Sequence, residues 1–523
     1  MTNWAGERLT ERQIWLVFIG LMVGNFLSAL DTMVLITALP SIVGDLGGLD
    51  HISWVVTAYL LSSTTSAPIY GKLSDLYGRK RLYQLAITIF VVGSMACGLA
   101  ADIGQLIMAR GVQGLGAGGL MVLSMSIIGD IVSPRQRGRY QGVMGASMAV
   151  ASVAGPLVGG FCVDHLSWRW AFFINVPLGV VALVVTATVL KLPAREIRRA
   201  RFDVTGTVLM IGAATSILLV VSWGGDQYAW DSTAIIGLTT LAVVCVAAFV
   251  PVERRAIEPL IPLRLFANDI FVVTVVSSLI LSVAMWGAWV AMPIFLQVVT
   301  GASASNSGLL TFPIMGMVTI SSTVTGRLVS RTGRYKIFPV AGTAIAVVAF
   351  LLYTTLDVDS SRLTASVFMV VLGFGLGMWM QTMTTIVQNA VEYRDLGIAT
   401  ATQNLFRSLG GSIGATLSLA VLNNRLGQAL TDHLTPTERG SLSREVLQGD
   451  PTHVDALPDR LHDIVVQAFA SGVHHAFLWA LPFAAVGLVV ILFLREIPLQ
   501  DDLPVPDELA DDESTPPEHL TVT

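Results

Sequence analysis

The segment GKLSDLYGRKR, residues 71–81, separates two long apolar runs. A weaker copy, GRLVSRTGRYK, occupies residues 326–336, again between apolar runs and 255 positions later. The same offset relates GPLVG at residues 155–159 to GGSIG at residues 410–414. An internally repeated chain of apolar runs joined by short basic loops is typical of membrane transporters.

Composition assigns the chain to the membrane proteins. Hydrophobic residues make up 53% of it and charged residues only 13%, with a mean hydropathy of +0.70. A soluble domain carries about 25% charged residues. Apolar runs long enough to cross a bilayer as helices fall near 14–39, 52–71, 82–101, 106–129, 140–163, 169–190, 204–223, 233–252, 270–298, 307–326, 337–355, 364–388, 399–422 and 474–494. They lack the alternation of barrel strands, so the sequence predicts an all-α polytopic membrane protein with about fourteen spans.

Basic side chains orient the predicted spans. They gather in alternate loops, near residues 71–81, 134–139, 191–201, 254–264 and 326–336. The opposing short connections near 40–51, 102–105, 224–232 and 299–306 contain no Lys or Arg. The positive-inside rule therefore predicts a plasma (inner) membrane protein with both termini in the cytoplasm.

The repeat divides the chain into two six-helix halves, residues 1–190 and 270–495. Between them, residues 191–269 form a linker with an inserted two-helix hairpin. A long outer loop is expected at 423–473, and 496–523 is expected to be a disordered acidic cytoplasmic tail. Within the outer loop, apolar residues at helical spacing predict an amphipathic helix on the membrane surface or the transporter rim: Leu457, Leu461, Ile464, Val465, Ala468 and Phe469.

The segment 71–81 suits a tight turn between two spans. Gly78 tolerates a positive φ, and Gly71 permits close helix approach. Asp75 is expected to cap the third span or to pair with a nearby Arg, while Arg79 and Lys80 meet the anionic leaflet. The alternative is that the segment only anchors the topology.

Asp31 is the strongest candidate for chemistry. Of the 36 acidic residues, it is the one placed well inside a predicted span, eight residues before Leu39. Burial penalises its charged form, whereas an organic cation beside it favours the charged form. These opposing effects are a basis for proton/cation exchange, and the alternative is a structural cap or a buried hydrogen bond. Arg407 lies deep in a run of the second half, where it closes the inner gate or satisfies backbone carbonyls.

Several motifs, in order, resemble those of a known family. The segment 71–81 resembles the signature between spans two and three of the major facilitator superfamily. Four further motifs resemble those of the fourteen-span drug:proton antiporters in this superfamily. They are residues 30–34 together with 38–40, residues 110–114 together with Gly116, residues 155–160, and residues 168–170 together with 175–177. Two departures occur, because Ile36 or Thr37 stands where Asn is usual and Ser330 stands where the first copy has Asp75.

The resemblance implies the major facilitator fold and specific roles for these motifs. It makes Arg110 the coupling partner of Asp31 and makes the segment 71–81 a latch for one conformer of the transport cycle. The fifth-span motif accompanies exporters in this family, although an ordinary Gly/Pro helix contact remains an alternative. Its residues here are Gly155, Pro156, Gly159 and Gly160.

Aromatic and thioether side chains in two later spans offer surface for flat lipophilic cations. The alternative is that they face lipid or fill the core. In the ninth run they are Met285, Trp286, Trp289, Met292 and Phe295, and in the twelfth, with one amide, Phe374, Met378, Trp379, Gln381 and Met383.

The predicted function is multidrug efflux of the kind that confers antibiotic resistance. We expect a monomeric secondary active exporter that exchanges lipophilic, cationic compounds for protons by alternating access. The sequence contains no Walker loop, so ATP-driven export within this chain is not expected. We expect no enzyme activity, cofactor, metal or nucleic acid partner, only small-molecule substrates, protons and membrane lipids. Two alternatives are an exporter of an endogenous lipid, siderophore or amino acid, and a non-transporting membrane sensor or scaffold.

Overall fold

A computed structural model of the chain describes residues 11–46, 52–190, 203–225, 227–302, 310, 312–435, 438, 446, 454, 457–497 and 499. Within these ranges the secondary structure is helical, apart from one bridge pair between Gly224 and Tyr228. The predicted all-α class is therefore confirmed. Residues 500–523 of the predicted tail, the linker at 191–202 and most of the outer segment 436–456 lie outside the described residues.

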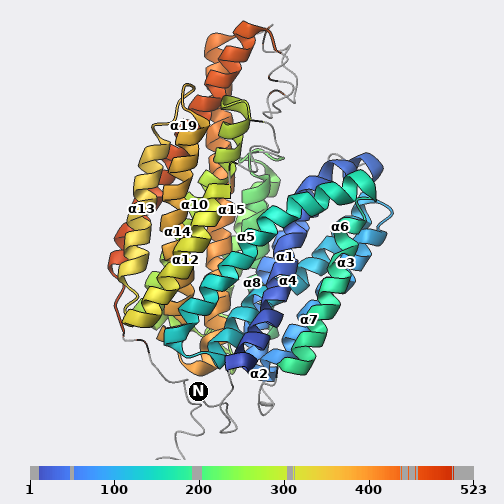
Figure 1. Ribbon diagram of the computed structural model, residues 1–523, viewed down its shortest axis with the longest axis vertical. Coiled ribbons are helices and arrows are strands. Elements are labelled where there is room, and N and C mark those ends of the chain that lie inside the picture. The colour runs from blue at the N-terminus through green and yellow to red at the C-terminus, as the bar shows by residue number, and fades with distance from the viewer. Residues whose placement is uncertain are drawn as a thin grey trace, which may run out of the picture.

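The first bundle contains the helices of the N-terminal part (Figure 1, blue to teal). They are α1 (Glu11–Leu46), α2 (Ile52–Tyr77), α3 (Arg79–Leu99), α4 (Ile103–Ile131), α5 (Pro134–His165), the short α6 (Trp170–Phe173) and α7 (Asn175–Val189). Helix α4 packs against α2 and α3, while α1 packs against α5 and α7. The bundle therefore places α1, α4 and α7, which are far apart in sequence, around one interior.

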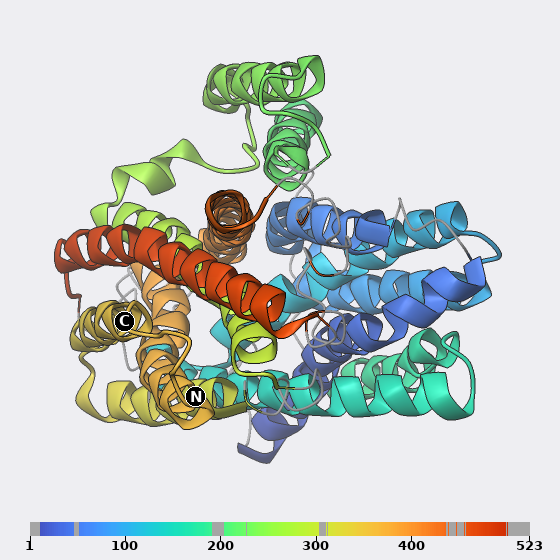
Figure 2. The same ribbon diagram turned by 90° about the horizontal axis from the view of Figure 1, so that it is seen from above.

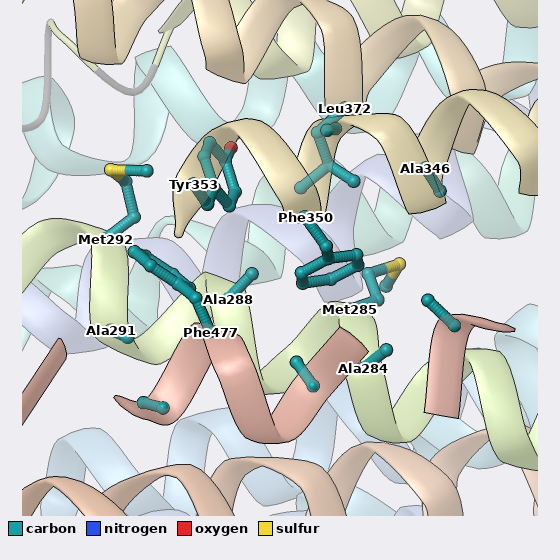
Figure 3. Packing of buried hydrophobic residues seen from close by; sticks show 14 of the residues in the cluster. Ala284, Met285, Ala288, Ala291, Met292, Ala346, Phe350, Tyr353, Leu372 and Phe477 are labelled. Carbon is teal, nitrogen blue, oxygen red and sulfur yellow. The ribbon is translucent and has the colours of Figure 1, made fainter. Parts of the chain in front are cut away.

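The second bundle contains the helices after residue 268 (Figure 1, yellow-green to red). They are α10 (Asp269–Ile294), which continues as a π-helical turn (Phe295–Val299), α12 (Phe312–Thr332), α13 (Ile337–Tyr353), α14 (Arg362–Ala390), α15 (Leu396–His433) and α19 (Asp459–Leu492). Figure 3 shows the core of this bundle, in which Met285 and Met292 of α10 lie among Phe350 and Tyr353 of α13 and Phe477 of α19.

The inserted hairpin consists of α8 (Val204–Trp223) and α9 (Thr233–Arg255). Figure 2 shows this green pair beside the two bundles, with α8 nearer to them. Helix α8 packs against α2 of the first bundle and α15 of the second. A single hydrophobic cluster joins Ala67 of α2, Met210 of α8 and Ile398 of α15, so the hairpin covers one seam between the bundles.

Among the described helices, eleven are long and apolar enough to cross a membrane. The other three that were expected to span are α2, α12 and α13. Helix α13 has only 17 residues, and α2 carries the charged residues Lys72 and Asp75 in its last turns. The structure thus agrees with a polytopic helical membrane protein. By length and composition, eleven of the described helices qualify as spans, compared with the fourteen or so that the sequence predicts.

The amphipathic helix expected in the outer loop is not a separate element lying on the membrane surface. Val465, Ala468 and Phe469 lie in α19, which starts at Asp459 and is continuous with the last apolar run. They share a buried cluster with Leu422 and Leu426 of α15, and these two long helices pack against each other. An apolar stripe at helical spacing indicates that a helix has a partner, but it does not distinguish lipid from another helix.

Candidate functional site

Asp31 lies inside the first bundle and is only 2% exposed. Its Oδ2 atom is 2.6 Å from a guanidinium nitrogen of Arg110 on α4. Its Oδ1 atom accepts hydrogen bonds from Gln113 Nε2 of α4 and from Asn175 Nδ2 of α7, both at 2.8 Å. Three helices therefore converge on one carboxylate, and both of its oxygens are satisfied.

Arg110 is fully buried and is held by more than Asp31. It donates to Gln113 Oε1 at 2.7 Å and to the Val55 carbonyl at 3.3 Å. Its guanidinium carbon lies 4.1 Å from the ring centroid of Tyr59, within cation–π range. Its second terminal nitrogen has no hydrogen-bond partner among the described residues, so one donor of this buried cation remains available.

Sequence reasoning missed the polar residues around this pair. Gln113 follows Arg110 by three positions, which places both on one helix face. Asn175 also donates to Ser94 Oγ at 2.9 Å, and Ser94 donates to the Phe172 carbonyl at 2.9 Å. The motifs that contain Gln113 and Asn175 were recognised, but only the meeting of α1, α3, α4 and α7 reveals what these side chains bind.

The geometry limits what Asp31 can do in this conformation. Its carboxylate has no exposed oxygen for an organic cation, because Arg110, Gln113 and Asn175 occupy both oxygens. Breaking a buried ion pair by removing one partner typically costs about 3–5 kcal/mol. A proton on Asp31 would remove its charge and weaken its attraction for Arg110, so the pair is suited to proton-dependent rearrangement.

The segment 71–81 lies at what we call the inner end of the bundles. Gly78 has φ +92°, as its place in the turn predicts. Asp75 contacts Arg79 at 3.2 Å, and Arg79 also contacts Asp130 at the end of α4 at 2.9 Å. Asp75 does not cap the third span, since α3 begins after Gly78 without a side-chain cap. The alternative expectation, an ion pair with a nearby Arg, is the one that the structure contains.

Asp75 reaches across to the second bundle. Its Oδ2 atom accepts a hydrogen bond from the Ile398 backbone N–H in the first turn of α15, at 3.1 Å. A carboxylate is favoured there by the partial positive charge of a helix N-terminus. A Cβ added to Gly71 would lie 2.7 Å from Ala401 Cβ and 2.9 Å from the Gly397 carbonyl oxygen. The first copy of the loop motif therefore holds α2 directly against α15.

Further contacts join the bundles at the inner end. Gln388 Nε2 of α14 donates to the Met125 carbonyl of α4 at 3.2 Å, and Arg137 of α5 donates to the Gln388 carbonyl at 3.4 Å. In Figure 1 the bundles converge at this end and diverge toward the other. The described conformation is therefore closed at the inner end.

The linker before α10 also contacts this end. Arg264 donates to both carboxylate oxygens of Asp395, at 2.9 and 2.8 Å. Burial raises the pKa of Asp395, and the charge of Arg264 opposes that rise. Lys80 donates to the Ala187 carbonyl at 2.8 Å, so it is bonded to α7. Arg79, which was expected to meet the anionic leaflet, is instead buried between Asp75 and Asp130.

The fifth-span glycines pack α5 onto α1. A Cβ on Gly155 would lie 2.3 Å from Met33 Cβ, and one on Gly159 would lie 2.0 Å from Thr37 Oγ1 and 2.9 Å from the Val34 carbonyl oxygen. A Cβ on Gly160 would meet nothing within 4 Å. Pro156 lies inside the helix. Because Met33 and Val34 follow Asp31 closely on α1, this contact positions the helix that carries the carboxylate.

Gly159→Ala is expected to impair transport, whereas its neighbour Gly160→Ala is expected to be silent. The added methyl group at position 159 forces α5 away from α1, and overpacking of this kind costs about 1–3 kcal/mol. Efflux rates of both variants at matched expression measure the difference. Equal activity of the two would show that the close α1–α5 contact does not matter for transport.

The remaining predicted residues do not form one surface. Arg407 of α15 approaches Met121 Sδ of α4 at 3.9 Å, so it reaches the other bundle.

Trp286 and Phe374 are 41% and 38% exposed, while Met378 and Gln381 are half-buried. Trp289 and Met292 line a cavity of about 90 Å³ within the second bundle, together with Tyr353, Met369 and Leu372. The others are buried in the hydrophobic core of that bundle: Met285, Phe295, Trp379 and Met383.

Comparison with known proteins agrees with this architecture. Residues 21–415 match the family described as Major Facilitator Superfamily. An uncharacterised MFS-type transporter of Mycobacterium tuberculosis (strain ATCC 25618 / H37Rv) is 41% identical over 500 residues, which cover 95% of this chain and 72% of the relative. The multidrug transporter protein MdtP of Bacillus subtilis (strain 168) is 39% identical over 510 residues, covering 93% and 94%.

A solved structure gives the same result for the fold. The human organic anion transporter MFSD10 (TETRAN) aligns with a TM-score of 0.62 at 15% identity, covering 92% of this chain and 100% of that one. The family assignment rests on the two helical bundles, which meet at a short basic loop, and on the family match over most of the sequence. This chain belongs to the major facilitator superfamily.

Proposed function

We propose that the protein exports lipophilic, cationic compounds by proton antiport and alternating access. Members of this superfamily are transporters and not enzymes. The observation that carries the proposal is the buried Asp31–Arg110 pair, with both Asp31 oxygens occupied. An intramembrane carboxylate paired with Arg is an expensive arrangement that usually marks an ion or proton pathway.

The proposed exchange has two half-cycles. In the conformation described, a proton from the outer side binds Asp31, neutralises it and frees Arg110 to contact water or other acceptors. The protonated protein then opens its inner end, where the contacts of Asp75 and Gly71 with α15 separate. The proton leaves to the cytoplasm as the substrate enters, and the ionised Asp31 pairs with Arg110 again on the return.

The protein matches a relative named a multidrug transporter over nearly the whole of both chains, which supports drug-like substrates. We further propose fourteen spans, counting α2, α12 and α13 with the apolar eleven, arranged as two six-helix halves and the hairpin α8–α9. Basic loops at the inner end favour a plasma membrane protein with cytoplasmic termini. A monomer is the simplest state for such a unit.

A reconstituted system tests the proposal. Vesicles with an acidic lumen and the purified protein are mixed with ethidium, so that molecules whose inner end faces the bath can exchange luminal protons for the dye. We expect dye accumulation that stops when the pH gradient is collapsed, together with alkalinisation of the lumen. Dye movement that ignores the gradient, or gradient-driven movement of organic anions alone, would contradict proton/cation antiport.

A further inference from the structure

Two carboxylates meet at the base of the α8–α9 hairpin, away from Asp31. Glu253, near the end of α9, is 3% exposed, and Asp203 immediately precedes α8. A Cβ on Gly206 would lie 2.3 Å from Asp203 Oδ2 and 2.9 Å from Glu253 Oε1. Both side chains therefore border the same small space, which exists because position 206 has no side chain.

Each carboxylate has one oxygen bonded and one oxygen without a partner. Asp203 Oδ1 accepts from the Gly206 N–H at 2.8 Å, and Glu253 Oε1 accepts from the Leu260 and Ile261 N–H groups at 3.2 and 3.4 Å. The other oxygens, Asp203 Oδ2 and Glu253 Oε2, are buried and have no hydrogen-bond partner among the described residues. A buried acceptor without a hydrogen bond has lost the water that would solvate it, so each unpartnered oxygen is destabilising, and more so when it is charged.

The surrounding charges do not neutralise the pair. Lys72 of α2 is the cation that acts on Glu253, and its ammonium group is already bonded to Glu258 Oε2 at 2.9 Å. Arg254 and Arg255, which follow Glu253 on α9, are exposed. When ionised, Asp203, Glu253 and Glu258 carry three negative charges against the one positive charge of Lys72.

We propose that Asp203 and Glu253 bind one proton between them. The proton comes from cytoplasmic water, forms an O–H bond on one carboxylate and is donated as a hydrogen bond to the other across the space beside Gly206, where Asp203 Oδ2 and Glu253 Oε1 lie. This single addition gives Asp203 Oδ2 a partner and removes one buried charge. A metal ion fits less well, because hard cations such as Mg²⁺ and Ca²⁺ take six or more oxygen ligands and the pair offers two free oxygens.

The site connects the hairpin to the loop that closes the inner end. Lys72 belongs to the segment 71–81 and is held by Glu258 of the linker after α9. When the pair loses its proton, the charge on Glu253 adds to the attraction of Glu258 for Lys72, and α2 is held more firmly to the hairpin. When the proton is bound, Glu258 acts alone. Cytoplasmic pH thereby adjusts how tightly the inner end is held.

Infrared difference spectroscopy of the purified full-length protein between pH 5 and pH 9 tests this proposal. The C=O band of a protonated carboxyl group should titrate in the wild type. The band should disappear in Glu253→Gln, a variant that retains an oxygen for the Leu260 and Ile261 N–H groups. In Asp203→Asn the band should no longer have its wild-type frequency. The band should persist in Asp31→Asn, so the result does not depend on the role proposed for Asp31.

Glu258→Gln is the matched control, since it removes a partly exposed acid in the same cluster. Its band should remain and titrate at lower pH, because Lys72 then acts on Glu253 without competition. The proposal fails if the band in Glu253→Gln matches the wild type, or if the wild type has no titrating band. It also fails if Na⁺ or Mg²⁺ added at constant pH displaces the band, because the pair would then hold a metal cation.

Discussion

Asp31→Asn should abolish gradient-driven efflux. Asparagine keeps an oxygen that can accept from Gln113 and Asn175, but it cannot carry a proton across a transport cycle or balance the charge of Arg110. Uptake into acidic-lumen vesicles should fall to that of protein-free vesicles. The unpaired Arg110 should also lower the free energy of unfolding by about 3–5 kcal/mol, because a buried cation loses its partner.

The double variant Asp31→Asn/Arg110→Gln separates these two effects. Without the buried cation, thermal stability should return toward that of the wild type, while transport should remain absent. Asp31→Glu serves as the conservative control and should keep some coupling. An Asn variant that transports at the wild-type rate, with the wild-type dependence on pH, would remove Asp31 from the coupling mechanism.

Gly71→Ala should shift the protein away from the conformation that is closed at its inner end. The new Cβ would lie 2.7 Å from Ala401 Cβ and 2.9 Å from the Gly397 carbonyl oxygen, closer than real Cβ contacts, so α2 and α15 must separate. An overpacking cost of about 1–3 kcal/mol changes the conformational equilibrium roughly 5–150-fold. We expect transport to fall and a cysteine introduced at Leu396, which is 1% exposed, to react faster with thiol reagents.

Gly111→Ala is the matched control, because a Cβ at this glycine of α4 would meet nothing within 4 Å. In the Gly111→Ala variant, a cysteine introduced at Leu396 should react with thiol reagents at the rate found without that substitution. The transport rate should also be unchanged. The native cysteines described at positions 97, 162 and 245 are buried, which keeps the background labelling low. Unchanged labelling in Gly71→Ala would mean that the contact of α2 with α15 does not hold the inner end closed.

The sequence was sufficient where one local property decides the structure. Long apolar runs dictate spanning helices, the turn after residue 77 requires the positive φ of Gly78, and a carboxylate deep in an apolar run needs a partner. It was insufficient where several helices must meet. The hydrogen bonds of Gln113 and Asn175 to Asp31 depend on the packing of α1, α4 and α7, which no local pattern encodes.

Side-chain type alone also fails to locate a binding surface. Trp286 and Trp379 were predicted for the same purpose, yet one is 41% exposed and the other is fully buried. An aromatic side chain can contact lipid, pack in the protein core or bind a ligand, because its ring is apolar. Likewise, the stripe at residues 457–469 correctly predicted a helix but left open whether it lies on the membrane surface or on the transporter rim, because periodicity does not identify what covers the apolar face.

The Asp31–Arg110 pair has an electrical consequence. It carries no net charge when Asp31 is ionised and one positive charge when Asp31 is protonated. In a one-for-one exchange, the protein moving a monovalent cation outward and the protein returning with a proton then carry the same charge. A membrane voltage contributes about 2.3 kcal/mol per charge per 100 mV, with opposite sign in the two half-cycles, so it cancels. The pH difference, about 1.4 kcal/mol per unit, is left as the sole driving force, and a cell that lowers its voltage without changing its pH would keep exporting.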